Sequence, residues 1–275
     1  PLDPLPAEGV VPPAPSAGYS LRRPRAGVVA DRVYLGLCAL AALIGVVVIA
    51  YLVARTMAET GPTVEQVGFW DFLTGTEWAS SAGQYGALPA IYGTLVISAI
   101  AMVVAVPLAV AVAIATTVLL PRWARGPVAG VIDLLAAIPS VVYGLWGLIV
   151  LVPAVTPVFE WIAAHNLGIG AFSGPILGGR SLLLAGLVLA VMILPIITAE
   201  VREGLATVPT DQREDALALG ATRWEMVRGA MLPWARSGIV GASALGLGRA
   251  IGETIAVAMI LGSQPTILES LLGPG

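Results

Sequence analysis

Five stretches of this chain are each about twenty residues or longer and almost free of charged side chains. A helix needs about 20 mainly apolar residues to cross the hydrocarbon core of a bilayer. Of the 275 residues, 57% are hydrophobic and 11% are charged, whereas about 25% are charged in an average soluble protein. The sequence therefore predicts an all-α, polytopic transmembrane helical bundle. The predicted spans cover residues 33–54, 88–118, 127–152, 181–199 and 237–262.

The basic residues indicate how these spans are oriented. All 14 are arginine. If the N-terminus is cytoplasmic, 11 of them fall in cytoplasmic segments, 2 fall outside and 1 lies within a span. Positive charge collects on the cytoplasmic side of membrane proteins, so we predict a cytoplasmic N-terminus in the cytoplasmic membrane. Residues 1–32, rich at first in Pro and Ala, are predicted to form a disordered cytoplasmic tail.

The residue types that are missing exclude several kinds of site. A phosphate-binding P-loop needs a lysine, and this chain has none. Cys38 is the only cysteine and His165 the only histidine, which makes a zinc site improbable. We therefore predict no catalytic residue, no metal site and no cofactor in this chain.

The polar segment between the last two spans carries helix-capping signals. Asp211 with Glu214 three residues later predicts a helix start, and Gly220 predicts its end. Thr222 with Glu225 predicts a second start through a capping box. This pattern indicates two short helices joined at a glycine, which suits a docking element. A plain solvated loop remains the alternative, because short capping motifs often match by chance.

Two charged residues lie inside the last predicted span. Arg249 near mid-bilayer costs about 2.5–3.5 kcal/mol on insertion scales. Glu253 is four residues further on, so both side chains are predicted to share one helix face. They are predicted either to form a structural ion pair or to meet an anion in a translocation path, and the path is favoured. Gly248 and Gly252 form a G-x-x-x-G pattern that permits close helix packing, within the chain or with a partner.

A break in the third predicted span adds weaker candidates. Pro139 interrupts its helical pattern, and Ser140 and Tyr143 follow directly. Broken helices can direct polar groups at a transported substrate. Both residues are therefore candidates for the substrate path, with packing as the alternative.

The polar segment also resembles the EAA loop of ABC importer permeases. It contains the string Glu214-Asp215-Ala216-Leu217-Ala218-Leu219-Gly220-Ala221, and later Leu232-Pro233. In that family the loop forms a coupling helix that docks on an ATPase subunit, so residues 200–236 are expected to form the coupling loop. The coupling residues are expected to be Asp211, Glu214, Asp215, Ala216, Gly220 and Ala221. Asp215 departs from the usual alanine and adds a negative charge to the docking face.

Further strings resemble the PstC-type permeases of phosphate-specific (Pst) ABC transporters. They lie at residues 246–254, 138–147, 72–78 and 220–225. The resemblance implies a type I ABC importer fold with six spans, five visible here and a sixth expected. It also implies a PstA-type permease as heterodimer partner, two PstB-type ATPases that bind ATP and Mg, and a PstS-type phosphate-binding protein. In that family an Arg and a Glu of the span corresponding to residues 237–262 are implicated in phosphate movement. The resemblance carries these roles over to Arg249 and Glu253.

These observations predict a permease subunit, driven by partner ATPases, that translocates inorganic phosphate. A permease of the same architecture for sulfate or molybdate is the alternative. An intramembrane enzyme is disfavoured because paired catalytic groups at matching depth are not evident. A stand-alone channel would leave the capped cytoplasmic segment unexplained. The predicted partners are the subunits above, phosphate and membrane lipid, with no nucleic acid.

Overall fold

The computed structural model describes residues 25–79, 83–164 and 180–262. Most of the predicted tail, His165 and the chain after Gly262 lie outside the described residues. The chain forms two units, one up to Thr63 and one from Val64, and each is considered by itself.

The first unit consists of most of helix α1, Arg25–Val67. This helix starts at Arg25, so the prediction of a disordered tail is wrong for residues 25–32. Its large apolar side chains from Val33 to Met57 are exposed on all sides. An apolar surface around a whole helix suits a lipid environment.

The second unit begins with short elements before its first long helix. Helix α2, Phe69–Thr74, is followed by the antiparallel strands β1, Trp78–Ala79, and β2, Gln84–Tyr85. The rings of Trp78 and Tyr85 meet edge to face across this hairpin, with centroids 5.6 Å apart.

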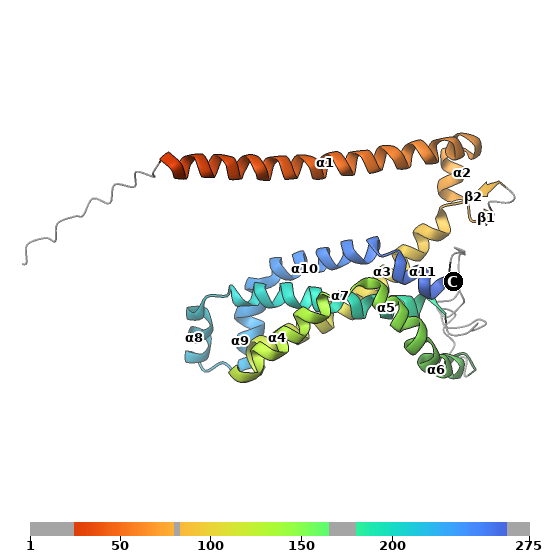
Figure 1. Cartoon of the computed structure of the whole chain (residues 1–275). Helices are drawn as coiled ribbons and strands as arrows, with labels where there is room; N and C mark the ends of the chain where they lie inside the picture. Colours follow the sequence, from red (N-terminus) through yellow and green to blue (C-terminus); the bar gives the residue numbers. More distant parts are fainter. Residues whose placement is uncertain (1–24, 80–82, 165–179, 263–275) are drawn as a thin grey trace, which may run out of the picture. The chain divides into compact units, whose positions relative to one another are not determined.

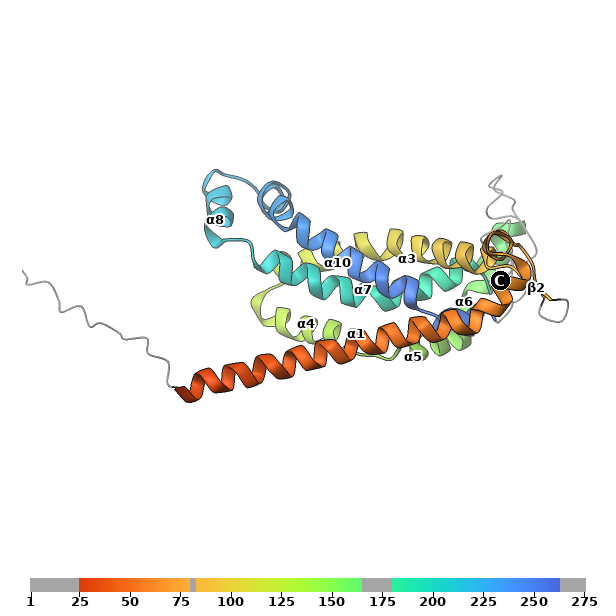
Figure 2. The same cartoon turned by 90° about the horizontal axis from the view of Figure 1, so that it is seen from above.

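Three long helices form the core of the second unit (Figures 1 and 2). They are α3, Leu88–Ile114, which continues as the π-helix η2, Ala115–Leu119; α7, Leu182–Ala206; and α10, Leu232–Gly252. Helix α7 is central, and most of its apolar stretch is buried. Helix α3 has a buried row of small side chains at every fourth position, which lets neighbouring helices approach closely. This row consists of Ala101, Ala105, Ala109 and Ala113.

The predicted span 127–152 requires correction. Helix α4, Arg122–Ala136, ends before Pro139, and a new helical run begins with α5, Ser140–Trp146. That run continues through η3, Gly147–Leu151, into α6, Val152–Ala164. Pro139 has an extended backbone and lacks an N–H, which explains the break. The stretch with the length and apolar character of a span is Ser140–Trp161.

The predicted loop 200–236 is also shorter than expected. Helix α7 continues past residue 199 to Ala206. Helix α8, Thr210–Ala218, follows, and then α9, Arg223–Met226, and η5, Val227–Met231, lead directly into α10. Pro233 does not interrupt this run, because it directly follows the π-helical turn η5, and such a local change of hydrogen-bond register accommodates a residue without an N–H.

The last predicted span is bent rather than straight. Helix α10 ends at Gly252, and α11, Ile255–Leu261, starts at an angle of 55° to it. The described residues thus hold four helices that could span a membrane by length and composition, or five if the bent pair counts as one. The all-α, multi-pass architecture is confirmed.

Helix α5 packs so closely on α11 that Gly144 cannot take a larger side chain without movement. A Cβ at Gly144 would lie 2.8 Å from the Cα of Ala256. We predict that Gly144→Ala lowers the free energy of unfolding by about 1–3 kcal/mol, the usual cost of overpacking. Thermal unfolding in detergent would measure this. Gly130→Ala is the control, since no atom lies within 4 Å of its Cβ position; equal losses in both variants would contradict the packing argument.

Candidate functional site

The bend between α10 and α11 separates Arg249 from Glu253. Arg249 lies in the last turn of α10, whereas Glu253 follows the helix with an extended backbone, φ −82° and ψ 104°. The predicted common helix face is therefore wrong. Glu253 is half-buried, and its Oε1 accepts a hydrogen bond from the backbone N–H of Ala256 at 3.3 Å. It thus stabilises the start of α11, as a capping acceptor does.

Arg249 makes no ion pair within the part of the chain that the structure describes. Its side chain is exposed on the surface of the second unit. A position in the last turn of α10 is favourable for a cation, because the helix dipole is negative there. The guanidinium nevertheless keeps its hydrogen-bond donors available for an external anion.

Tyr143 lies close enough to Arg249 to interact with it electrostatically. Its ring is 8% exposed, and its hydroxyl donates to the carbonyl of Leu135 at 2.8 Å. That carbonyl belongs to the last turn of α4 and also accepts from the backbone N–H of Ile138 at 3.3 Å. Ser140 is half-buried at the start of α5. Tyr143 and Arg249 therefore both lie near helix breaks, and Tyr143 also has a structural bond.

The exposed side of α10 near Arg249 carries the predicted packing glycines. No atom of the chain lies within 4 Å of a Cβ built at Gly248 or Gly252. Internal contact instead occurs at Gly246, where a Cβ would lie 2.5 Å from Cδ1 of Ile197. The small size of the residue is the only sequence signal for this contact.

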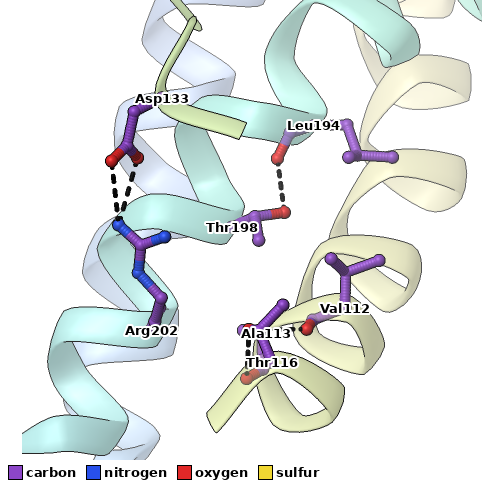
Figure 3. A network of polar contacts seen from close by, with 7 residues as sticks. All are labelled: Val112, Ala113, Thr116, Asp133, Leu194, Thr198 and Arg202. Carbon is purple, nitrogen blue, oxygen red and sulfur yellow. Dashed lines mark hydrogen bonds and ion pairs between the residues drawn. The ribbon is translucent and has the colours of Figure 1, made fainter. Parts of the chain in front are cut away.

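Other polar side chains of the bundle are bonded within the chain (Figure 3). Arg202 on α7 donates to Asp133 on α4, at 3.0 Å to Oδ1 and 3.4 Å to Oδ2. The buried hydroxyl of Thr198 donates to the carbonyl of Leu194 at 2.8 Å. Thr116 bonds to backbone carbonyls of its own helix in the same way. The Arg202–Asp133 pair thus joins α7 to α4, whereas the two threonine bonds lie within single helical runs.

The predicted coupling residues lie on or next to α8. Asp211, Glu214 and Asp215 are exposed, whereas Ala216 and Ala221 are half-buried. The predicted cap at Asp211 is wrong, because α8 starts after Pro209 and no side chain caps it.

The end of α8 is as predicted. Gly220 has φ +86°. Its N–H donates to the carbonyl of Leu217 at 3.0 Å, and the N–H of Ala221 donates to the carbonyl of Ala216 at 3.1 Å. This pair of bonds is a Schellman motif. It fixes the direction in which the chain leaves α8.

Both ends of α8 are fixed to long helices. At its start, Arg213 Nη2 donates to the carbonyl of Leu205 in the last turn of α7. After its end, the capping box of Thr222 and Glu225 is confirmed, and it begins the helical run into α10. The Arg213 bond was not predicted, because it depends on how α8 turns back on α7.

Comparison with known proteins places these features in context. The family described as "Binding-protein-dependent transport system inner membrane component" matches residues 105–273. The chain is 46% identical over 209 residues to "Phosphate transport system permease protein PstC" of Xylella fastidiosa (strain 9a5c). It is 40% identical over 220 residues to the protein of that name from Haemophilus influenzae. The matches cover 74% and 76% of this chain, and 64% and 70% of those proteins. The chain thus spans slightly less than two thirds of the length of the Xylella protein.

The positive φ at Gly220 generates a prediction. Gly220→Val should lower the free energy of unfolding by about 1–2 kcal/mol, since a β-branched residue opposes a left-handed backbone. Gly220→Asn should lose less, because Asn tolerates this region. Gly229→Val is the control, in a helical position with no atom within 4 Å of its Cβ. Thermal unfolding of the three variants would test this, and a Val and an Asn variant of equal stability would argue against it.

Proposed function

Because the chain belongs to the binding-protein-dependent transport system inner membrane components, and among them to the PstC-type permeases, we propose that it translocates inorganic phosphate across the cytoplasmic membrane. The observation that carries the proposal is Arg249 beside a broken helix, where no carboxylate of the described residues pairs with it. Transporters form substrate sites from discontinuous helices of this kind. A guanidinium binds the oxygens of a tetrahedral anion through two parallel hydrogen bonds.

The second half of the path is supplied by a partner permease of the PstA type. Gly248 and Gly252 lie close to the exposed Arg249, and no atom of the described chain packs against the Cβ position of either glycine. Small residues allow a second helix to approach closely. A partner on this side would enclose Arg249 and exclude lipid from the guanidinium. The sixth span remains a prediction.

Energy is supplied by two PstB-type ATPases that bind ATP and Mg. The exposed acids of α8 form the surface on which one of them docks. From Arg223 to Gly252 the chain is one helical run of roughly 45 Å, at about 1.5 Å per residue. A displacement of α8 therefore moves both α7 and the helix that carries Arg249. This linkage supports alternating access. In this mechanism a PstS-type protein delivers phosphate from outside the membrane, and the N-terminus of the chain lies on the cytoplasmic side.

The role of Arg249 can be tested in the assembled transporter in proteoliposomes. Arg249→Ala should reduce ATP-dependent phosphate uptake by at least about tenfold, because a charge-assisted hydrogen bond contributes about 1.5–3 kcal/mol. Arg236→Ala is the control, since Arg236 is exposed on the same helix but far from the bend. Uptake that persists in Arg249→Ala would refute the proposed path. Loss of subunit assembly would indicate a structural role instead.

The identity of the anion needs a separate measurement, because a guanidinium can bind sulfate or molybdate as well. Uptake of labelled phosphate should be inhibited by unlabelled phosphate and not by equal concentrations of sulfate or molybdate. Stronger inhibition by either of these anions would favour the alternative permease.

A further inference from the structure

A cluster of arginines surrounds a pocket at the end of the bundle that lies far from the bend between α10 and α11. The pocket has a volume of about 660 Å³ and lies where η2 turns into α4, beside α8 and α9. Four arginines line it, and no acidic residue does. They are Arg122, Arg125, Arg213 and Arg223. None of the four forms an ion pair with any carboxylate among residues 25–79, 83–164 and 180–262.

Two of these guanidinium groups are held in place by backbone carbonyls. Arg125 donates from Nε to Leu120 at 2.9 Å and from Nη2 to Val118 at 3.4 Å. Arg213 donates to Leu205. These bonds occupy only part of the donors, and Nε of Arg213 is buried without a partner. The other N–H groups of these two guanidiniums are left for a further acceptor, which the described residues do not supply.

The rest of the lining is apolar. The side chains beneath the arginines include Val118, Leu119, Leu217, Met226 and Met231. A small hydrated anion gains nothing from such a surface, whereas a ligand with both an anionic and a hydrocarbon part fits it. The pocket also lies at the end of the apolar helix Leu88–Leu119, where lipid headgroups meet a spanning helix.

We propose that this pocket binds an anionic phospholipid, with the headgroup phosphate held by the arginines and the start of an acyl chain on the apolar lining. Basic pockets between helices on the cytoplasmic side are suited to such headgroups. Because Arg213 and Leu217 belong to α8, the lipid would bridge the coupling helix and the η2–α4 turn. The inference requires a membrane-embedded chain but does not depend on phosphate being the transported anion.

The test uses the full chain in its assembled complex, with native mass spectrometry of retained lipids. The wild type should retain phosphatidylglycerol and not phosphatidylcholine. The double variant R122Q/R223Q, which leaves the two carbonyl-bonded arginines in place, should lower phosphatidylglycerol occupancy by about tenfold. The matched control R228Q/R236Q removes two exposed arginines that do not line the pocket, and it should retain lipid as the wild type does. Equal loss in both double variants would overturn the proposal, as would equal retention of both lipids.

Two further measurements distinguish the other possible occupants. Excess inorganic phosphate should not displace the lipid, and displacement that depends on Arg122 and Arg223 would identify a free-anion site. The variant Leu217→Trp should weaken lipid retention by filling the apolar part while the charges remain, so the test does not depend on R122Q/R223Q folding. Retention unchanged by Leu217→Trp, or a cross-link from the pocket to an acidic partner segment in place of lipid, would refute lipid binding. Phosphate uptake measured in the same preparations separates failure of this inference from failure of the transport proposal.

Discussion

The hydrocarbon interior of a membrane supplies no hydrogen-bond partners, and the irregular parts of this bundle depend on that constraint. The carbonyl of Leu135 at the end of α4 is satisfied by the hydroxyl of Tyr143, and the first turn of α11 is satisfied by Glu253. Thr198 bonds to its own helix. With these groups satisfied internally, Arg249 is left as the charged side chain at the bend that can meet something from outside.

The same constraint makes the helices that connect the α8 end of the bundle to the bend after Gly252 stiff. Helices with satisfied backbones are stiff, and α8 is bonded at its start to the end of α7 and leads, through Gly220 and the Thr222 capping box, into α10. This linkage is the route by which the proposed coupling would reach the helix that carries Arg249. The bend after Gly252 is the point at which such a movement can change the surroundings of the guanidinium.

The sequence was a good guide to features set by composition and by neighbouring residues. Apolar runs gave the multi-pass class, and the stop at Gly220 and the box at Thr222 were correct because both are local patterns. It failed where a competing local signal or distant packing decided the outcome. Pro209 started α8 before Asp211 could cap it. The bend after Gly252 accompanies the close packing of α11 on Gly144 of α5, a contact between residues more than a hundred positions apart.

Arginine is the sole basic residue type here, and the chain uses it in different ways. Arg202 pairs with Asp133, which fixes α4 to α7, while Arg125 and Arg213 donate to carbonyls at helix ends. A planar group with five donors can do this, whereas the point charge of lysine would satisfy fewer acceptors at once. Residue type alone therefore cannot identify the transport site. Like the arginines of the pocket, Arg249 pairs with no carboxylate within the described part of the chain. What sets Arg249 apart is its place beside the break in a helix pair that could span the membrane, where an uncompensated charge is costly. Such a cost is tolerated where the missing partner arrives from outside, and a travelling anion meets that condition.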